Sequence, residues 1–122
     1  MRHQSATVHE LAQIGLLAEL PGEKLARLAE RMERRVLAPG EAVLRQGEEG
    51  DRFYVLLAGV LNVRQASRGE RGLLRPGDYF GEVALVMGVP RTATVSALTP
   101  ATLASCDRKT FDEFVRPLFT EG

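Results

Sequence analysis

The chain has 122 residues, of which 44% are hydrophobic and 26% are charged, and these proportions are typical of one globular domain. Its 16 Lys and Arg residues balance 16 Asp and Glu residues, which argues against a general nucleic-acid-binding protein because such proteins are usually basic. The longest apolar run, residues 55–60, is too short to cross a bilayer, and the start of the chain lacks the layout of a signal peptide. The single cysteine, Cys106, cannot form an internal disulfide, and this favours a reducing, cytoplasmic setting.

Residues 7–33 are expected to be mainly helical. Thr7 followed by Glu10 has the pattern of a capping box at the start of a helix, and Pro21 is suited to the first position of a second helix. The apolar residues of the second segment have the i, i+3, i+4, i+7 spacing of one buried helical face: Leu25, Leu28, Ala29 and Met32.

The pattern changes in residues 35–107, where short β-rich runs alternate with turn signals. Six to eight strands separated in this way favour a small antiparallel barrel or sandwich. Residues 53–57 are apolar on both faces, which is typical of a central strand. Residues 92–97 alternate polar and apolar side chains, which is typical of a half-buried strand.

The helical period returns in residues 108–116, and Asp107 is a candidate N-cap for this helix. Phe111, Phe114 and Val115 share one face that can pack on the β-barrel. Pro117 is expected to end the helix, because proline lacks the backbone N–H of a helix interior. The sequence therefore predicts one domain over residues 1–122, with helices in 7–33, a β-barrel in 35–107 and a short helix in 108–116.

The segment with the clearest chemistry is residues 80–95, with the sequence FGEVALVMGVPRTATV. Gly81 permits close approach of the backbone, and residues 82–86 can form one helical turn whose unpaired N–H groups attract an anion. The turn ends at Gly88 and Pro90, which direct Arg91 inward, where its guanidinium can bind a phosphate. A phosphate repels Glu82, so this carboxylate is useful only if it accepts a hydrogen bond from a nearby hydroxyl. A ribose phosphate satisfies both groups, so the segment predicts a site for a compact sugar phosphate whose base extends over apolar surface.

This segment resembles a known family. Phe80-Gly81-Glu82-x-Ala84-Leu85, followed by Pro90-Arg91-Thr92-Ala93-Thr94-Val95, is similar to the phosphate-binding cassette of cyclic nucleotide-binding domains. Residues 47–55, followed by Gly59, are similar to the glycine-bearing strand region of that family, and the resemblance covers residues 11–116. It implies a mainly β fold, an antiparallel β-jelly roll with flanking helices, and cAMP, cGMP or both as the ligand, with no further cofactor and no metal.

The resemblance also implies roles for single residues. Arg91 would pair with the cyclic phosphate, and Glu82 would bind the ribose 2′-hydroxyl. The other implied ligand-binding residues are Gly81, Ala84 and Thr92 through their backbone N–H groups, and Val83, Leu73 and Leu74 as apolar walls. Some cAMP-selective kinase domains have alanine where this chain has Thr92, and a hydroxyl there often accompanies contact with guanine, so the preference for cAMP or cGMP stays open.

The function implied is that of a regulatory sensor module and not of an enzyme. The ending of the chain resembles bacterial domains fused to transporters or other effectors, so an effector in a longer parent is the expected partner, with no nucleic acid and no insertion into a membrane. Family members usually continue with a helix that covers the nucleotide. We expect that lid to be missing from these 122 residues and the isolated chain to be a monomer.

Several other interpretations remain open at this point. Glu82 and Arg91 can form a simple surface ion pair, and Thr92 can be an ordinary strand residue. The domain can also be a degenerate jelly roll that acts as a protein-interaction module. A metal-dependent enzyme is disfavoured, because no histidine follows residue 9. Apart from Gly81, the glycines of the β region are interpreted as turn formers: Gly47, Gly50, Gly59, Gly69, Gly72 and Gly77.

Overall fold

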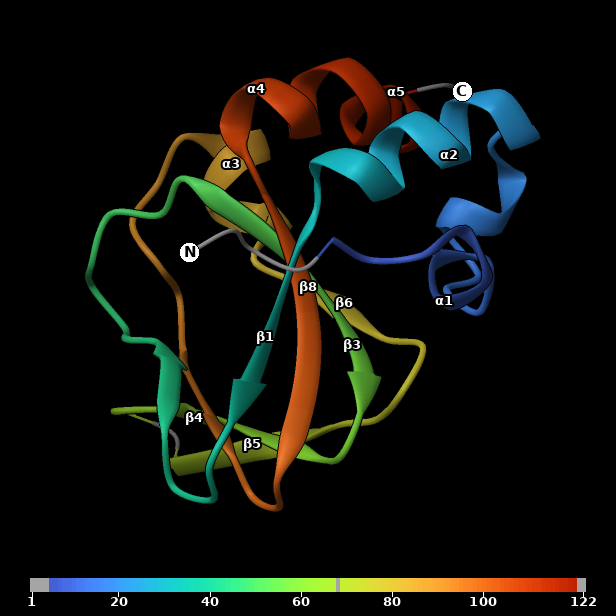
Figure 1. Ribbon diagram of the computed structural model, residues 1–122. Coiled ribbons are helices and arrows are strands. Elements are labelled where there is room, and N and C mark those ends of the chain that lie inside the picture. The colour runs from blue at the N-terminus through green and yellow to red at the C-terminus, as the bar shows by residue number, and fades with distance from the viewer. Residues whose placement is uncertain (1–4, 68, 121–122) are drawn as a thin grey trace.

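The computed structural model describes residues 5–67 and 69–120, and it consists of two four-stranded antiparallel sheets with helices gathered at one end (Figure 1). The first sheet has the order β1 (Glu33–Leu37), β8 (Ala101–Asp107), β3 (Arg52–Ala58) and β6 (Tyr79–Phe80). The second has the order β2 (Ala42–Leu44), β7 (Thr94–Ala97), β4 (Leu61–Gln65) and β5 (Gly69–Leu74). This confirms the antiparallel β-roll that the short runs and turns of the sequence predict.

Strand β3 is apolar on both faces because each face packs against a different layer. Phe53 and Val55 belong to the hydrophobic cluster between the first sheet and the helices. Tyr54 and Leu56 belong to the cluster between the two sheets. The alternation of side chains along a strand accounts for this division, and β3 is indeed an inner strand, between β8 and β6.

The N-terminal helical region consists of α1 (Val8–Ala12), the 3₁₀ turn η1 (Leu17–Glu19) and α2 (Gly22–Arg31). The capping box is confirmed: Glu10 N donates to Thr7 Oγ1 at 3.1 Å, and Thr7 N donates to Glu10 Oε1 at 3.0 Å. The expectation that Pro21 is the first residue of the second helix is wrong. Pro21 has an extended ψ of 149° and is the N-cap residue before α2. The predicted apolar stripe of α2 and its C-cap is buried: Leu25, Leu28, Ala29 and Met32.

The C-terminal helical region is longer than the sequence predicts. It consists of α4 (Arg108–Thr110), the π-helical turn η2 (Phe111–Val115) and α5 (Arg116–Thr120), and Asp107 caps it by accepting from Thr110 N at 2.9 Å. The expectation that Pro117 ends the helix at residue 116 is therefore wrong. The backbone N–H of Arg116 donates to Phe111 O, the spacing of a π-helix, and a new α-helix begins there. Pro117 falls in the first turn of this helix, where a missing N–H breaks no hydrogen bond.

The helices pack on the face of the first sheet that points away from the second sheet. Phe111 lies with its ring centroid 5.3 Å from that of Phe53, and Phe119 of α5 makes an edge contact with Tyr79 at 5.6 Å. Cys106 is fully buried in the same cluster, and burial raises the pKa of its thiol to about 12. The N-terminal and C-terminal helical regions thus cover the same side of the first sheet. Strand β6 contacts this helical layer through Tyr79.

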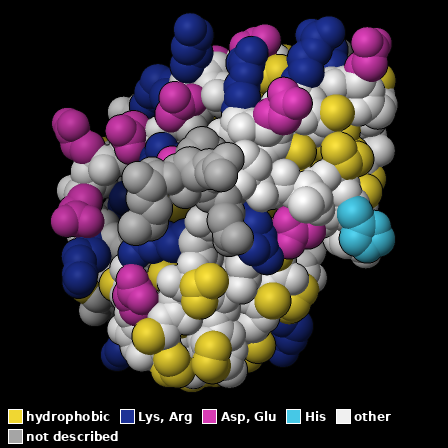
Figure 2. Space-filling model, viewed as in Figure 1, with side chains coloured by type: hydrophobic (Ala, Val, Ile, Leu, Met, Phe, Trp, Pro, Cys, Tyr) yellow, Lys and Arg dark blue, Asp and Glu magenta, His cyan; other side chains and the backbone are white. Residues whose placement is uncertain are grey.

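Charged side chains of both signs are intermixed on the face shown in Figure 2, including its upper edge. The ion pairs of the described residues include Arg31–Glu113 at 2.7 Å and Arg52–Glu33 at 2.8 Å. Among the described residues, no helix is long and apolar enough to span a membrane. Nor does this part of the chain bring together three His, Cys, Asp or Glu side chains that could hold a metal ion.

Candidate functional site

The segment singled out in the sequence forms a strand, a sharp turn and a short helix. Strand β6 ends at Phe80, Gly81 takes a left-handed conformation with φ +90°, and α3 (Glu82–Met87) follows at once. An L-residue with a side chain rarely adopts this φ, so the direct turn from strand into helix requires glycine at position 81. Gly88, with φ +67°, ends the helix, and the chain then returns toward the cavity at Arg91.

A cavity of about 190 Å³ lies beside this turn, between α3 and the ends of both sheets. The sequence-predicted residues that line it are Gly81, Glu82, Val83, Ala84, Arg91, Thr92 and Leu74. Sequence reasoning missed the remaining walls, which come from four strands and a bend: Leu44, Val63, Tyr79, Phe80, Ala93 and Val95. The cavity therefore has two charged residues in its wall, Glu82 and Arg91, and most of its other lining residues are apolar.

Leu73 does not line this cavity, so its assignment as an apolar wall is corrected. It pairs with Asn62 across the β4–β5 ladder, and 36% of its surface is exposed. Neighbouring residues of a strand point to opposite faces, so only one of two adjacent leucines can face the cavity. That residue is Leu74, which pairs with buried Leu61.

Arg91 is buried, with only 6% of its surface exposed. Its Nη1 donates to Gly81 O at 2.8 Å and its Nη2 donates to Arg52 O at 2.9 Å, so two backbone carbonyls fix the guanidinium. The ring of Tyr54 lies 5.8 Å from Cζ, and this ring stacks on Phe80 in turn. A guanidinium carries five N–H groups, so these two bonds leave donors for an anion in the cavity.

Glu82 and Arg91 do not form the surface ion pair that was the simplest alternative. The ion pairs of the described residues include none between these two side chains, although each influences the other through space. Burial raises the pKa of Glu82, while its own backbone N–H and Arg91 oppose that rise. Burial lowers the pKa of Arg91, while Tyr54, Asp51 and Glu82 oppose that change. The site thus holds a desolvated acid and a desolvated base that are separate from each other.

Thr92 lies in the bend that precedes β7, because that strand begins at Thr94. Its side chain is exposed and lines the cavity, and its backbone carbonyl accepts from Gln65 Nε2 at 3.0 Å. The alternative that Thr92 is an ordinary strand residue is therefore wrong, because this residue lies outside β7.

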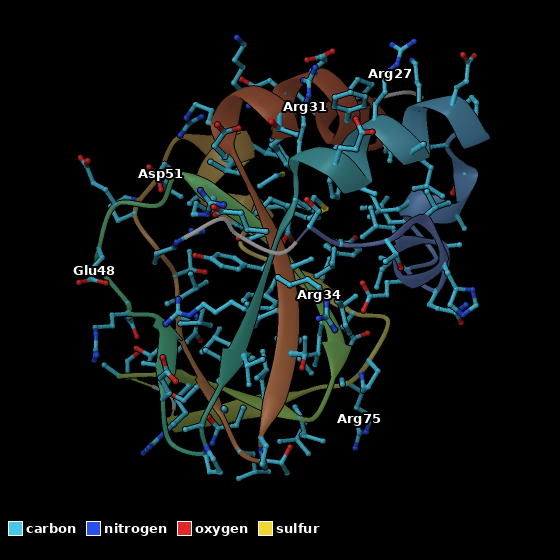
Figure 3. All side chains as sticks on the ribbon, in the orientation of Figure 1. Arg27, Arg31, Arg34, Glu48, Asp51 and Arg75 are labelled. Atoms are coloured by element: carbon cyan, nitrogen blue, oxygen red, sulfur yellow. The ribbon has the colours of Figure 1, made fainter. Side chains whose placement is uncertain are left out.

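The connection between β2 and β3 forms hydrogen bonds with both the N–H and the carbonyl of Arg91, a contact that the sequence did not predict. Arg91 N donates to Glu48 O at 2.8 Å, and Gly47 N donates to Arg91 O at 2.9 Å. In Figure 3 Glu48 and Asp51 label this connection, which runs beside the segment that follows α3. The sequence signal for this contact is the glycine-bearing block of residues 47–55, whose glycines also suit turns.

The C-terminal end of α3 is held by the last helical region. The carbonyl of Leu85 accepts from Arg116 Nη2 at 2.9 Å and from Arg108 Nη1 at 3.4 Å. The last carbonyls of a helix have no partner within that helix, so these two arginines supply partners from outside. The same Arg116 pairs through Nε with Asp112 at 2.8 Å, which fixes its direction.

The family model of the cyclic nucleotide-binding domain matches residues 34–117 of this chain. The chain belongs to the cyclic nucleotide-binding domain family. A cAMP-dependent protein kinase regulatory subunit from Yarrowia lipolytica is 36% identical over 121 residues, which are 95% of this chain and 32% of that protein. The chain thus spans less than half of the length of this curated relative.

Two solved structures show the same fold. The regulatory domain of Toxoplasma gondii PKA, in a co-crystal with cAMP, superposes with a TM-score of 0.84 at 28% identity, over 91% of this chain and 44% of that one. The second is the regulatory subunit of a cAMP-independent protein kinase A from Trypanosoma brucei, with a TM-score of 0.84 at 27% identity over 92% of this chain and 43% of that one. It is a variant with three substitutions, glutamate to alanine, threonine to arginine and valine to alanine, and it is bound to cAMP.

Proposed function

We propose that this domain is a regulatory module that binds cAMP, cGMP or both in the cavity beside α3. The observation that carries the proposal is the placement of Arg91, a buried arginine held by two carbonyls at the wall of a cavity that also contains Glu82. Two desolvated charges of opposite sign that do not neutralise each other favour a ligand with an anion for one and a hydroxyl for the other. A ribose cyclic phosphate has both groups close together.

The proposed contacts follow from the cavity walls. Arg91 pairs with the cyclic phosphate, and the backbone N–H groups of Gly81, Ala84 and Thr92 support it. Glu82 accepts from the ribose 2′-hydroxyl. The base lies on the apolar part of the cavity, near Val83 and Leu74 and the strand residues Val63 and Val95.

The variant from Trypanosoma brucei, which is bound to cAMP, supports a cyclic nucleotide as the ligand, although its third substitution gives alanine where this chain has Thr92. Its glutamate-to-alanine substitution lies seven residues before its threonine-to-arginine substitution. In this chain Ala84 and Arg91 have the same residue types at the same spacing. A large acid at position 84 would face the phosphate end of the cavity, so alanine there and arginine at 91 are suited to an anionic ligand.

The effector is proposed to be a kinase rather than a transporter, because the named relatives are kinase regulatory subunits or domains. They give no support to the expectation of a bacterial, transporter-fused member. We propose further that residues 1–122 act as one domain without catalytic activity of its own, in the cytoplasm. Fractionation of cells that express the parent protein tests the compartment, and affinity purification tests the partner.

Calorimetric titration with cAMP and with cGMP tests the proposed function directly. We expect saturable binding of one or both nucleotides at one site per chain, and much weaker binding of 5′-AMP, whose phosphate is not tied to the ribose 3′-oxygen. If neither cyclic nucleotide binds at millimolar concentration, the domain is the degenerate jelly roll considered above, and a role in protein interaction replaces the role in sensing.

Thr92→Ala is expected to weaken cGMP binding more than cAMP binding. The Thr92 hydroxyl lines the cavity, and a hydrogen bond between neutral groups contributes about 0.5–1.5 kcal/mol, or roughly 2- to 12-fold in affinity. Titration of the variant and the parent with both nucleotides gives the change in the ratio of dissociation constants. An unchanged ratio would show that the hydroxyl does not contact the base.

Hydrogen exchange with and without saturating cAMP is expected to show protection mainly in residues 80–95 and smaller changes in residues 116–120. The described residues 116–120 do not line the cavity, so in the 122-residue chain we expect the base to be partly open to water and the ribose phosphate to provide most of the affinity. We also expect light scattering to show a monomer. Stronger protection in residues 116–120 than in 80–95, or a stable dimer, would contradict this view of the C-terminal region.

A further inference from the structure

Gly50 lies directly against the side chain of Arg91. A Cβ atom placed on residue 50 would overlap Cζ and Nε of Arg91 and would lie 2.8 Å from its Cδ. A Cβ atom does not come so close to a non-bonded neighbour in folded proteins, so any side chain at position 50 must displace the guanidinium or the loop that carries the residue.

We propose that Gly50 is a positioning residue for the phosphate-binding arginine, an inference that rests on the proposed function. The missing side chain leaves a slot, and the guanidinium of Arg91 occupies it. In the slot Arg91 reaches both of its carbonyl partners, Gly81 O and Arg52 O, and keeps its position at the wall of the cavity.

The slot has a second glycine on another side. A Cβ atom at Gly81 would lie 3.1 Å from Nη1 of Arg91 and 3.0 Å from Arg52 O. Gly81, however, also needs to be glycine because of its φ of +90°. Gly50 is not among the described glycines with positive φ, so alanine is compatible with its backbone. The requirement for glycine at position 50 therefore comes from the guanidinium and not from the turn.

The loop cannot easily move away to make room. It is fastened to the backbone of Arg91 shortly before Gly50, through Gly47 N and Glu48 O, and strand β3 begins two residues after Gly50, at Arg52. A methyl group at position 50 therefore pushes on the end of the Arg91 side chain, which is the more mobile partner. The displaced guanidinium loses its two carbonyls and its alignment with the phosphate.

The test is a double-mutant cycle with four proteins: the parent, Gly50→Ala, Arg91→Ala and the double variant. Calorimetry with cAMP gives the affinity, and urea unfolding without nucleotide gives the stability of each. We expect Gly50→Ala to weaken cAMP binding by about tenfold to 150-fold in the parent, as for the loss of one charged hydrogen bond. In the Arg91→Ala background it should change neither affinity nor stability, because no guanidinium remains to clash with.

Gly15→Ala is the matched control. Gly15 is exposed, has no positive φ, and its added Cβ would have no atom within 4 Å, so this variant should behave as the parent. If Gly50→Ala does not fold, rescue of folding by the second substitution Arg91→Ala supports the slot.

The proposal is overturned if Gly50→Ala reduces the cAMP affinity and the free energy of unfolding by the same amounts with and without the Arg91 side chain. Gly50 would then act independently of Arg91. If Arg91→Ala binds cAMP as tightly as the parent, the proposed phosphate contact fails, but the unfolding cycle still decides the question. Coupling between the two substitutions in the free energy of unfolding would then support the slot, and additivity would overturn it.

Discussion

Arg91→Ala is expected to weaken the binding of cAMP or cGMP by about 2–5 kcal/mol, or roughly 30-fold to several thousandfold in affinity. The loss is large because Arg91 is the buried cation of the cavity, and its removal leaves the phosphate without a charged partner. Calorimetry with parent and variant under the same conditions measures it. Equal affinity in the two proteins would exclude Arg91 as the phosphate ligand.

The same variant is also expected to be less stable without ligand. Arg91 satisfies the carbonyls of Gly81 and Arg52, and alanine leaves both without this partner. An unsatisfied buried acceptor costs about 1–3 kcal/mol, so affinity must be measured well below the unfolding midpoint of the variant. Arg91→Lys is the control, because lysine keeps the charge but cannot form the two-pronged contact.

Glu82→Ala is expected to weaken binding of a ribose cyclic nucleotide by about 1.5–3 kcal/mol, or roughly tenfold to 150-fold. The loss is that of a hydrogen bond from the 2′-hydroxyl to a carboxylate. The effect should shrink greatly with 2′-deoxy-cAMP, which has no such hydroxyl. If ribose and deoxyribose ligands lose affinity alike, Glu82 does not contact the 2′-hydroxyl.

Without ligand, Glu82→Gln is the informative control for Glu82. Burial raises the pKa of this carboxyl in the folded protein, so the charged form is less favourable there than in the unfolded chain. The free energy of unfolding should therefore fall as the pH rises through the carboxyl's titration, and the glutamine variant should lose this dependence. A glutamine variant that binds weakly and is no less stable than the parent would separate the ligand role of Glu82 from a structural one.

Local sequence signals predicted the parts of the fold that depend on neighbouring residues. The capping box at Thr7, the cap at Asp107 and the turn at Gly81 each involve residues a few positions apart, and the structure contains all three. The acid and the arginine of the candidate site also lie in one short segment. Their placement at one cavity therefore followed from the motif.

Features that depend on distant residues could not be predicted in this way. The clash between a side chain at position 50 and Arg91 exists only after the β2–β3 connection folds over the segment that follows α3. The choice between Leu73 and Leu74 depends on the register of β5 against β4, which hydrophobicity at two adjacent leucines does not encode. The sequence wrongly predicts a helix end at Pro117. The π-helical turn before it lets a new helix begin at Arg116, and Pro117 is compatible with the first turn of that helix.

The two arginines on the carbonyl of Leu85 limit the motions that are open to this domain. Arg108 begins α4 and Arg116 begins α5, so one oxygen at the end of α3 is tied to two points that flank the π-helical turn. A rotation of α3 about its own axis would have to break both contacts or carry the final helix with it. Helix α3 and the last helical region are therefore linked more tightly than two separate helices, and we expect a displacement of α3 to be accompanied by a displacement of residues 108–120.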